Sequence, residues 1–368
     1  MAIQKFDPKE LELKDVSAFG RTMKDFSYPI SKREAVEAAF ARKPWWQVTQ
    51  AVDARMFSPE IIPDNIARAL VWEAAGENGP RKFADHEINK DMFGVEWEYI
   101  AQVGGSMVRP GKPFMEDIEE WYDTIVWPDI DSWDWKGSAE RNNQSFLTKD
   151  TLNQMWFQTG YFERLIALLE FENALMAVFD EDSKEHVHKF FDKLTELYIS
   201  IFDKAKQTFP ELNALFFHDD WGSQKAPFFS PAVCEEMIVP YMKRLTDFLH
   251  GKGIFCEIHS CGNNYQQIPN YIKAGWDAWA PQLMNDSYKI YDDYGDTLLI
   301  ATFPQEMPTA EELGKLPEEE IRKYARTHAD RVCRPEKSSF YNFYASDYLQ
   351  IPAFKEELYI RSRENYSK

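Results

Sequence analysis

Helical patterns alternate with short apolar segments from about residue 150 to the end of the chain, and this alternation constrains the fold more than any other feature. The apolar segments are typical of strands and lie at residues 213–220, 254–259, 278–281, 297–302 and 339–345. Amphipathic helix patterns separate them, and no hairpin turn joins one strand to the next. This order predicts a parallel sheet covered by helices, which is an α/β fold.

The length of the chain favours a closed barrel over an open sheet. A chain of 368 residues is long for one ordinary domain, but α/β barrels of this size remain a single unit. No glycine-rich dinucleotide-binding loop follows a predicted strand, which disfavours an open nucleotide-binding sheet. We therefore predict a single (β/α)8 TIM barrel domain over residues 1–368.

The first 150 residues are less regular and contain several short segments interrupted by proline and glycine. We predict that residues 1–40 form an N-terminal extension wrapped on the barrel. The segment at residues 43–48 is the expected first strand of the barrel.

Charge and composition exclude several functional classes. The chain carries 61 acidic and 42 basic residues, a formal net charge of −19, which repels nucleic acid and anionic membranes. No run of about 18 apolar residues and no signal-peptide pattern is present, so we expect a cytoplasmic protein. The four cysteines are too few, in a chain without a signal peptide, to predict a disulfide framework.

The residues that could take part in catalysis or metal binding lie at the ends of the predicted strands, because active sites of barrels lie where the strands end. His259 and Cys261 are two residues apart at one such end, so their side chains point to the same side of the strand. An imidazole and a thiolate together are half of a tetrahedral zinc site. Such a pair also occurs in ordinary packed strands, but Gly262 and Asn263 place this pair at an accessible turn.

Several motifs occur in this region, among them HDDWGSQ at residues 218–224 and HSCGN at residues 259–263. Others lie at residues 229–231, 274–277, 281–282 and 294–296. Together they closely resemble the uroporphyrinogen decarboxylase family, and within it the methyltransferase branch. The resemblance covers roughly residues 150–355 well and the first 150 only loosely.

The resemblance implies a (β/α)8 barrel and, in the corrinoid methyltransferases of this branch, a zinc ion held by the His-x-Cys-Gly motif. His259 and Cys261 match that motif. The family's further ligand, a cysteine at the end of the last strand, is absent, and Asp347 stands at the position that matches it. Asp347 and Glu257, which lies two residues before His259, are therefore the candidates for further zinc ligands.

Two neighbouring acids, Asp219 and Asp220, are the candidate catalytic residues. They would orient His259 by hydrogen bonding, or protonate a leaving oxygen, or simply accept backbone donors in the turn. These alternatives remain open at the level of sequence.

The matching stretch near residues 45–55 contains a single arginine, whereas true uroporphyrinogen decarboxylases use several arginines to bind substrate carboxylates. The resemblance therefore favours a zinc-dependent methyltransferase that moves a methyl group to the cob(I)alamin of a separate corrinoid protein. The chain has no Asp-x-His-x-x-Gly cobalamin motif of its own. Two alternatives are a metal-free lyase related to the decarboxylases and a non-catalytic barrel that binds a corrinoid or porphyrin.

Aromatic and amide side chains near the predicted strand ends suit a phenyl methyl ether, such as a guaiacol- or vanillate-like compound, as the methyl donor. Each of these side chains is also compatible with simple packing in the barrel. The candidate substrate-binding residues are Trp46, Trp221, Gln224, Gln282, Tyr344 and Tyr348.

Overall fold

The computed structural model describes residues 4–18, 21–50, 52–75, 80–102, 104–111 and 113–368. The chain divides into two compact units, each described separately below. The first unit comprises Met1–Arg55, Lys149–Leu152 and Asp277–Lys368, and the second comprises Met56–Thr148 and Asn153–Trp276. The expectation of a single domain stays a prediction.

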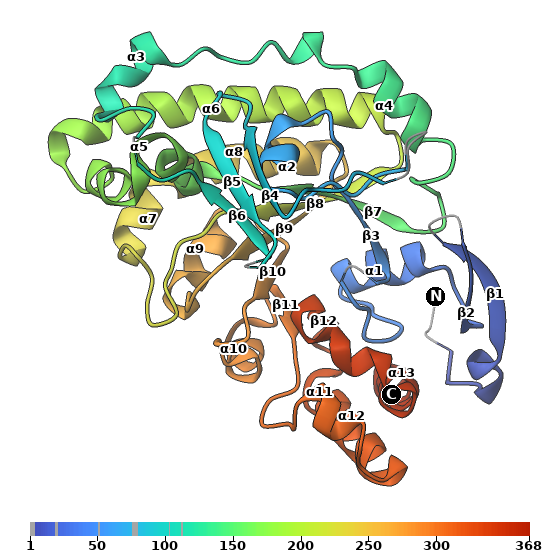
Figure 1. Cartoon of the computed structure of the whole chain (residues 1–368). Helices are drawn as coiled ribbons and strands as arrows, with labels where there is room; N and C mark the ends of the chain where they lie inside the picture. The colour runs from blue at the N-terminus through green and yellow to red at the C-terminus, as the bar shows by residue number, and fades with distance from the viewer. Residues whose placement is uncertain (1–3, 19–20, 51, 76–79, 103, 112) are drawn as a thin grey trace. The chain divides into compact units, whose positions relative to one another are not determined.

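A seven-stranded sheet with the strand order β12-β11-β10-β9-β8-β7-β3 is the central element of the fold (Figure 1). Its strands are β3 (Ala54–Phe57), β7 (Leu152–Phe157), β8 (Leu212–His218), β9 (Phe255–Ser260), β10 (Ala278–Pro281), β11 (Leu299–Thr302) and β12 (Ser339–Tyr341). The pairs β7–β8, β8–β9, β10–β11 and β11–β12 are all parallel. Helices surround this sheet, so the predicted α/β class with a TIM-barrel-like fold is confirmed, with seven strands in the sheet among the described residues.

The first unit contains an antiparallel pair of strands and the last three strands of the sheet with their helices. The antiparallel pair is β1 (Leu13–Ala18) with β2 (Arg21–Phe26). The helical elements of this unit are η1 (Pro8–Leu11), α1 (Lys32–Phe40), α10 (Ser287–Tyr294), α11 (Ala310–Leu313), α12 (Glu318–Val332), η5 (Phe343–Gln350) and α13 (Pro352–Tyr366). Glu10 forms a buried ion pair with Arg363 of α13, with 2.9 Å between Oε2 and Nε. The N-terminal extension is therefore attached to the last helix of its own unit.

The strand predicted at residues 43–48 is wrong in extent. These residues form no regular strand, and the nearest pairing is a single parallel bridge between Thr49 and Tyr341. The side chain of Asp53 accepts a hydrogen bond from the backbone N–H of Thr49 (2.8 Å), which bends the chain here. The regular strand β3 begins only at Ala54, after this turn.

The second unit contains β7 to β9, the helices that follow them, and a separate antiparallel sheet of order β4-β5-β6. Its elements outside the large sheet are α2 (Pro63–Ala67), β4 (His86–Lys90), β5 (Glu96–Ile100), β6 (Gly105–Val108), η2 (Ile118–Glu120), α3 (Trp121–Thr124), η3 (Ile130–Ser132), α4 (Trp135–Asn142), α5 (Tyr161–Ala177), α6 (Glu181–Thr208), α7 (Pro231–Met237), α8 (Val239–Gly251), η4 (Tyr265–Gln267) and α9 (Ile268–Lys273).

Burial explains why these segments take the structure they do. Every residue of β8 is buried, as expected for a parallel strand with both faces covered. In α6, buried residues recur three or four positions apart, at Val187, Phe190, Phe191, Leu194 and Tyr198, so one side of the helix packs inward. Asp180 accepts the N–H of Ser183 and caps the helix at its start.

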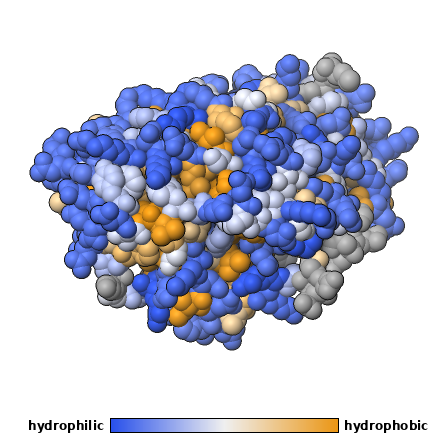
Figure 2. All heavy atoms as spheres, turned by 90° about the horizontal axis from the view of Figure 1, so that it is seen from above, coloured by the Kyte–Doolittle hydropathy of each residue, from blue (hydrophilic) through white to orange (hydrophobic). Residues whose placement is uncertain are grey.

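The visible surface is mostly hydrophilic, with apolar side chains in small separate groups (Figure 2). Among the residues that the structure describes, no helix is both long enough and apolar enough to span a bilayer.

Candidate metal centre

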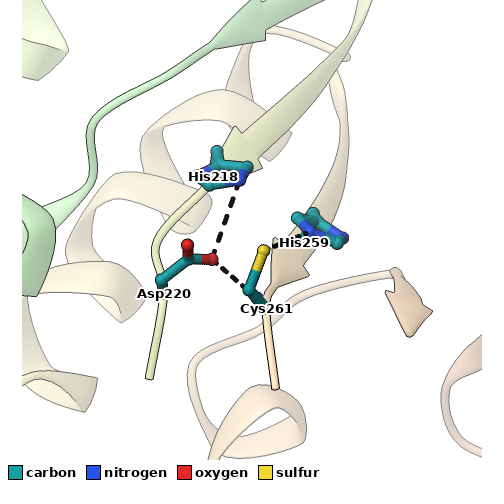
Figure 3. Close-up of side chains that lie close together, drawn as sticks. All are labelled: His218, Asp220, His259 and Cys261. Carbon is teal, nitrogen blue, oxygen red and sulfur yellow. Dashed lines mark hydrogen bonds and ion pairs between the residues drawn. The ribbon is translucent and has the colours of Figure 1, made fainter. Parts of the chain in front are cut away.

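Four side chains that can bind a metal meet where β8 and β9 end (Figure 3). His218 is the last residue of β8 and Asp220 follows it, while His259 lies in β9 and Cys261 follows that strand. One donor atom from each of the four lies within 4.8 Å of the others. The parallel register brings this about, because it sets His218 directly beside His259. We call these four residues the metal-binding group.

Short contacts order the group internally. The backbone N–H of Cys261 donates to Oδ1 of Asp220 at 2.6 Å, and Nε2 of His259 lies 3.4 Å from Sγ of Cys261. Nε2 of His218 lies 3.7 Å from the same Asp220 oxygen. The loop after β8 is thus connected to the loop after β9 through Asp220, which fixes the distance between the two pairs of donors.

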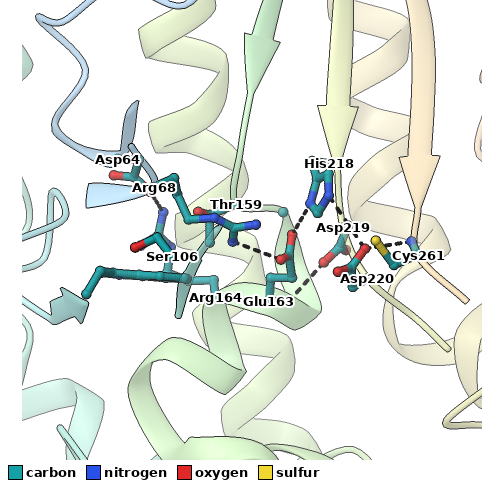
Figure 4. A network of polar contacts seen from close by, with 12 residues as sticks. Asp64, Arg68, Ser106, Thr159, Glu163, Arg164, His218, Asp219, Asp220 and Cys261 are labelled. Atoms are coloured by element: carbon teal, nitrogen blue, oxygen red, sulfur yellow. Dashed lines mark hydrogen bonds and ion pairs between the residues drawn. The ribbon is translucent and has the colours of Figure 1, made fainter. Parts of the chain in front are cut away.

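A hydrogen bond at its other ring nitrogen, Nδ1, orients His218. Nδ1 lies 2.7 Å from Oε2 of Glu163, a residue in the first turn of α5, and Oε1 of Glu163 accepts a hydrogen bond from Arg68 at 2.9 Å (Figure 4). A histidine that binds a metal commonly donates its second N–H to a carboxylate, which fixes the tautomer and the ring orientation. His218 has this arrangement, with Nε2 directed at the rest of the group.

Burial and neighbouring charges shift the pKa values of Cys261, His218 and Asp220. Burial raises the pKa of Cys261 to about 11, although His218 nearby lowers it. Burial would lower the pKa of His218, but the negative charges of Glu163 and Asp220 raise it well above its usual value. For Asp220, burial acts to raise the pKa, and the two histidines together with the N–H of Cys261 outweigh it, so the pKa is lowered.

Asp219 points away from this group and supports α5 instead. Its oxygens accept hydrogen bonds from the backbone N–H groups of Tyr161, Phe162 and Glu163, at 2.9 to 3.2 Å. Burial and the charge of Glu163 raise its pKa to about 7. Of the roles considered for the acid pair, Asp219 has that of accepting backbone donors, at the start of a helix.

The other predicted metal ligands lie outside this group. Glu257 is buried in β9 and accepts a hydrogen bond from Gln154 at 2.7 Å, and burial raises its pKa to about 8. Asp347 is exposed on η5 and belongs to the first unit, whereas the metal-binding group belongs to the second. Both remain predictions as ligands.

The predicted substrate-binding residues have diverse surroundings. Trp46 is 2% exposed and stacks on Tyr28, and Trp221 is fully buried and stacks on Tyr271. Gln224 is exposed, and Gln282 is partly buried.

Tyr344 is exposed, with its ring close to that of Phe343. The hydroxyl of Tyr348 donates to the carbonyl of Pro308 at 2.9 Å. The role of all six candidates in binding a substrate stays a prediction.

Sequence reasoning did not single out His218, Glu163 or Arg68. His218 stood within a motif at a predicted strand end, and the signal that was available is its register with His259 in the neighbouring parallel strand. Glu163 and Arg68 follow no local pattern, because their partners are 55 and 95 residues away in sequence.

The fold and this group define an α/β, TIM-barrel-like protein with a candidate transition-metal centre at the carboxyl ends of two parallel strands. No family model and no curated protein sequence matches the chain. Among solved structures, the chain is similar to one described as a methyltransferase from Methanosarcina mazei, with a TM-score of 0.52 and 13% sequence identity. The similarity covers 92% of this chain and 100% of that one, and it supports the assignment of the fold.

Proposed function

We propose that the chain is a zinc-dependent methyltransferase that moves a methyl group from a small methylated compound to the cob(I)alamin of a corrinoid protein. The observation that carries the proposal is the metal-binding group of His218, Asp220, His259 and Cys261. Two further observations are consistent with it: the resemblance of the sequence motifs to the methyltransferase branch, and the similar fold of a protein described as a methyltransferase.

The donor set of the group suits zinc. Two imidazole nitrogens, one thiolate and one carboxylate oxygen are all common zinc ligands, and the mixture of nitrogen and sulfur disfavours magnesium and calcium. The hydrogen bond from His218 to Glu163 adds the outer support expected around a bound metal. A catalytic zinc site keeps one position for the substrate, so we propose that three of the four residues bind zinc throughout. We propose Asp220, whose side chain is 28% exposed and which offers the only oxygen donor of the four, as the weakest ligand.

Zinc would supply a Lewis acid that lowers the pKa of the heteroatom from which the methyl group leaves. The residues of the chain would bind the ion, orient His218 through Glu163, and keep the donor atoms in place through the Asp220 contact to Cys261. The transfer would break the bond between the heteroatom and the methyl carbon and leave the electron pair on the heteroatom. The methyl carbon would form its new bond with an electron pair from the reduced corrinoid of the partner protein.

For the methyl donor we propose a phenyl methyl ether of the guaiacol or vanillate type, because a phenolate is a feasible leaving group. The partner would be a separate corrinoid protein in the cytoplasm. Glu257 and Asp347 remain proposed as alternatives to Asp220 for the weakest zinc ligand, and Asp220, an ionised carboxylate with a lowered pKa, as a catalytic residue beside the metal.

The test combines metal analysis with a transfer assay. We expect close to one zinc per native chain as purified, and demethylation of a guaiacol-type ether with a reduced corrinoid protein. In Cys261→Ser the zinc content as purified should fall, because one ligand is missing, and the demethylation should be lost. Absence of zinc from folded native protein, even after zinc is added, would contradict the proposal and favour the metal-free lyase. Zinc with a spectral change of an added corrinoid, but no methyl transfer to it, would favour the binding protein.

A further inference from the structure

We infer that Glu163 and Arg68 are positioning residues of the metal centre, with Glu163 orienting His218 toward the metal and Arg68 fixing Glu163. This inference rests on the proposed zinc site. It assigns a role in that site to Arg68, which lies in the irregular first 150 residues of the chain.

The first step concerns the proton between Glu163 and His218. Oε1 of Glu163 accepts from the guanidinium of Arg68, and Oε2 lies 2.7 Å from Nδ1 of His218. A carboxylate paired with an arginine in this way accepts at its second oxygen too, so the hydrogen of this contact is on Nδ1. Deprotonated His218 then has its lone pair on Nε2, which is the nitrogen that faces Asp220. Glu163 therefore selects the tautomer in which His218 binds a metal on the side of the other three donors.

The second step concerns what holds Glu163 itself. Its other oxygen, Oε1, accepts from Nη1 of Arg68 at 2.9 Å, and both side chains are largely buried. The guanidinium of Arg68 lies 4.8 Å from the ring centre of Trp97, which belongs to β5 of the small antiparallel sheet. With each oxygen bound to a different partner, the carboxylate has a single orientation.

The third step concerns the neighbouring residue, Arg164. This arginine, labelled in Figure 4 together with Asp64, is fully buried. It forms ion pairs with Asp64 of α2 and with Asp91, which follows β4. Two consecutive residues at the start of α5 are thus attached to the segment around α2 and the small sheet. The structural consequence is a fixed first turn of α5, and so a fixed position of Glu163 against His218.

A purely structural role for Glu163 would affect stability, but its effect on zinc would not depend on His218. We would measure zinc affinity by competition with a chromophoric chelator for the native chain, Glu163→Gln, Glu163→Leu and Arg68→Gln, with urea unfolding of the metal-free proteins alongside. Glu96→Gln is the matched control. Glu96 lies in the same strand as Trp97, but the side chains of its ion pair with Arg109 are exposed, so its loss should not affect the metal centre.

We expect Glu163→Leu to weaken zinc binding about 10- to 100-fold, with smaller losses in Glu163→Gln and Arg68→Gln and none in the control. In a His218→Ala chain, Glu163→Leu and Glu163→Gln should cause no further loss, because their effect acts through that histidine. Two results would overturn this inference and leave the proposed zinc site intact, provided that the native protein binds zinc. One is a zinc affinity of Glu163→Leu and Glu163→Gln within about twofold of the native value. The other is an equal loss of zinc affinity from these substitutions in the native and His218→Ala chains. Native protein that binds no zinc would overturn the proposed function as well.

Discussion

Gly262 lies so close to Gly222 that a Cβ atom on Gly262 would be 2.3 Å from the carbonyl carbon and oxygen of Gly222. Gly262 also has a φ of +93°, a conformation that other residues rarely adopt. The two glycines bring the loops after β8 and β9 together, and the N–H of Asn263 donates to the carbonyl of Ser223 at 2.8 Å. This close approach is what allows Asp220 to reach the backbone of Cys261.

Gly262→Ala is expected to separate the two loops. We predict a loss of unfolding free energy of about 2–4 kcal/mol, measured by urea unfolding, and weaker zinc binding. Gly253→Ala is the matched control, since Gly253 has a φ of +71° but no atom within 4 Å of the added Cβ. It should cost only the backbone strain, about 1–2 kcal/mol, and leave zinc affinity unchanged. Equal effects of the two variants on zinc would contradict this account of the loops.

The adjacent acids Asp219 and Asp220 are expected to give opposite results. Asp219→Asn removes one of two oxygens that accept three backbone N–H groups, so the metal-free protein should lose about 1–3 kcal/mol of stability. Asp220→Asn should instead reduce zinc affinity, with a smaller effect on the metal-free fold. Chelator competition and urea unfolding on both variants check the pair. A larger loss of zinc affinity in Asp219→Asn than in Asp220→Asn would show that the roles are reversed.

Zinc binding should release protons. Without metal the pKa of Cys261 is about 11, raised mainly by burial, so the thiol is protonated near neutral pH, and the raised pKa of His218 keeps that ring protonated too. Zinc requires the thiolate and a free imidazole nitrogen, so apparent affinity should rise with pH below these pKa values.

Calorimetric titration of zinc in two buffers with different ionisation enthalpies measures the protons released. We expect about two for the native chain near pH 7 and about one fewer for Cys261→Ser. An affinity independent of pH, or the same release from both proteins, would mean that the Cys261 thiolate is not a ligand.

The ion pair between Glu10 and Arg363 should stabilise the first unit in a pH-dependent way. Burial acts to raise the pKa of Glu10, but hydrogen bonds from Arg363 and Tyr359 outweigh it and the pKa is lowered. A lowered pKa in the folded state means that the stabilisation is present above the unfolded pKa and is lost as pH falls through the folded one.

Glu10→Gln should therefore cost about 3–5 kcal/mol at neutral pH, because it leaves Arg363 buried without its counter-charge. The difference from the native chain should shrink as the pH is lowered below about 4 in a series of urea unfolding curves. Glu96→Gln, which removes an exposed pair, should cost less than about 1 kcal/mol. A difference that stays constant down to pH 3 would contradict the role of this pair.

The fold class was predictable because it depends on local periodicity. Alternating helices and buried strands identified the α/β class, and the spacing of His259 and Cys261 identified half of the metal-binding group. The extent of the first strand was predicted wrongly, because residues 43–48 lead to a single bridge at Thr49 and then to a turn, and the regular strand β3 starts only at Ala54.

The rest of the site depends on contacts that sequence alone does not show. Asp220 was identified, but as an acid and not as a metal donor, and His218 joins the group only through the register of β8 with β9. Glu163 and Arg68 join it through side-chain contacts between elements far apart in sequence.

Zinc K-edge X-ray absorption of the zinc-loaded native chain, beside Cys261→Ser and His218→Ala, tests the central claim most directly. The account predicts one sulfur at about 2.3 Å together with nitrogen and oxygen ligands at about 2.0–2.2 Å. The sulfur shell should vanish in Cys261→Ser, and the imidazole contribution should fall in His218→Ala. A native spectrum without sulfur, or one unchanged by both substitutions, would contradict the assignment of zinc to this group.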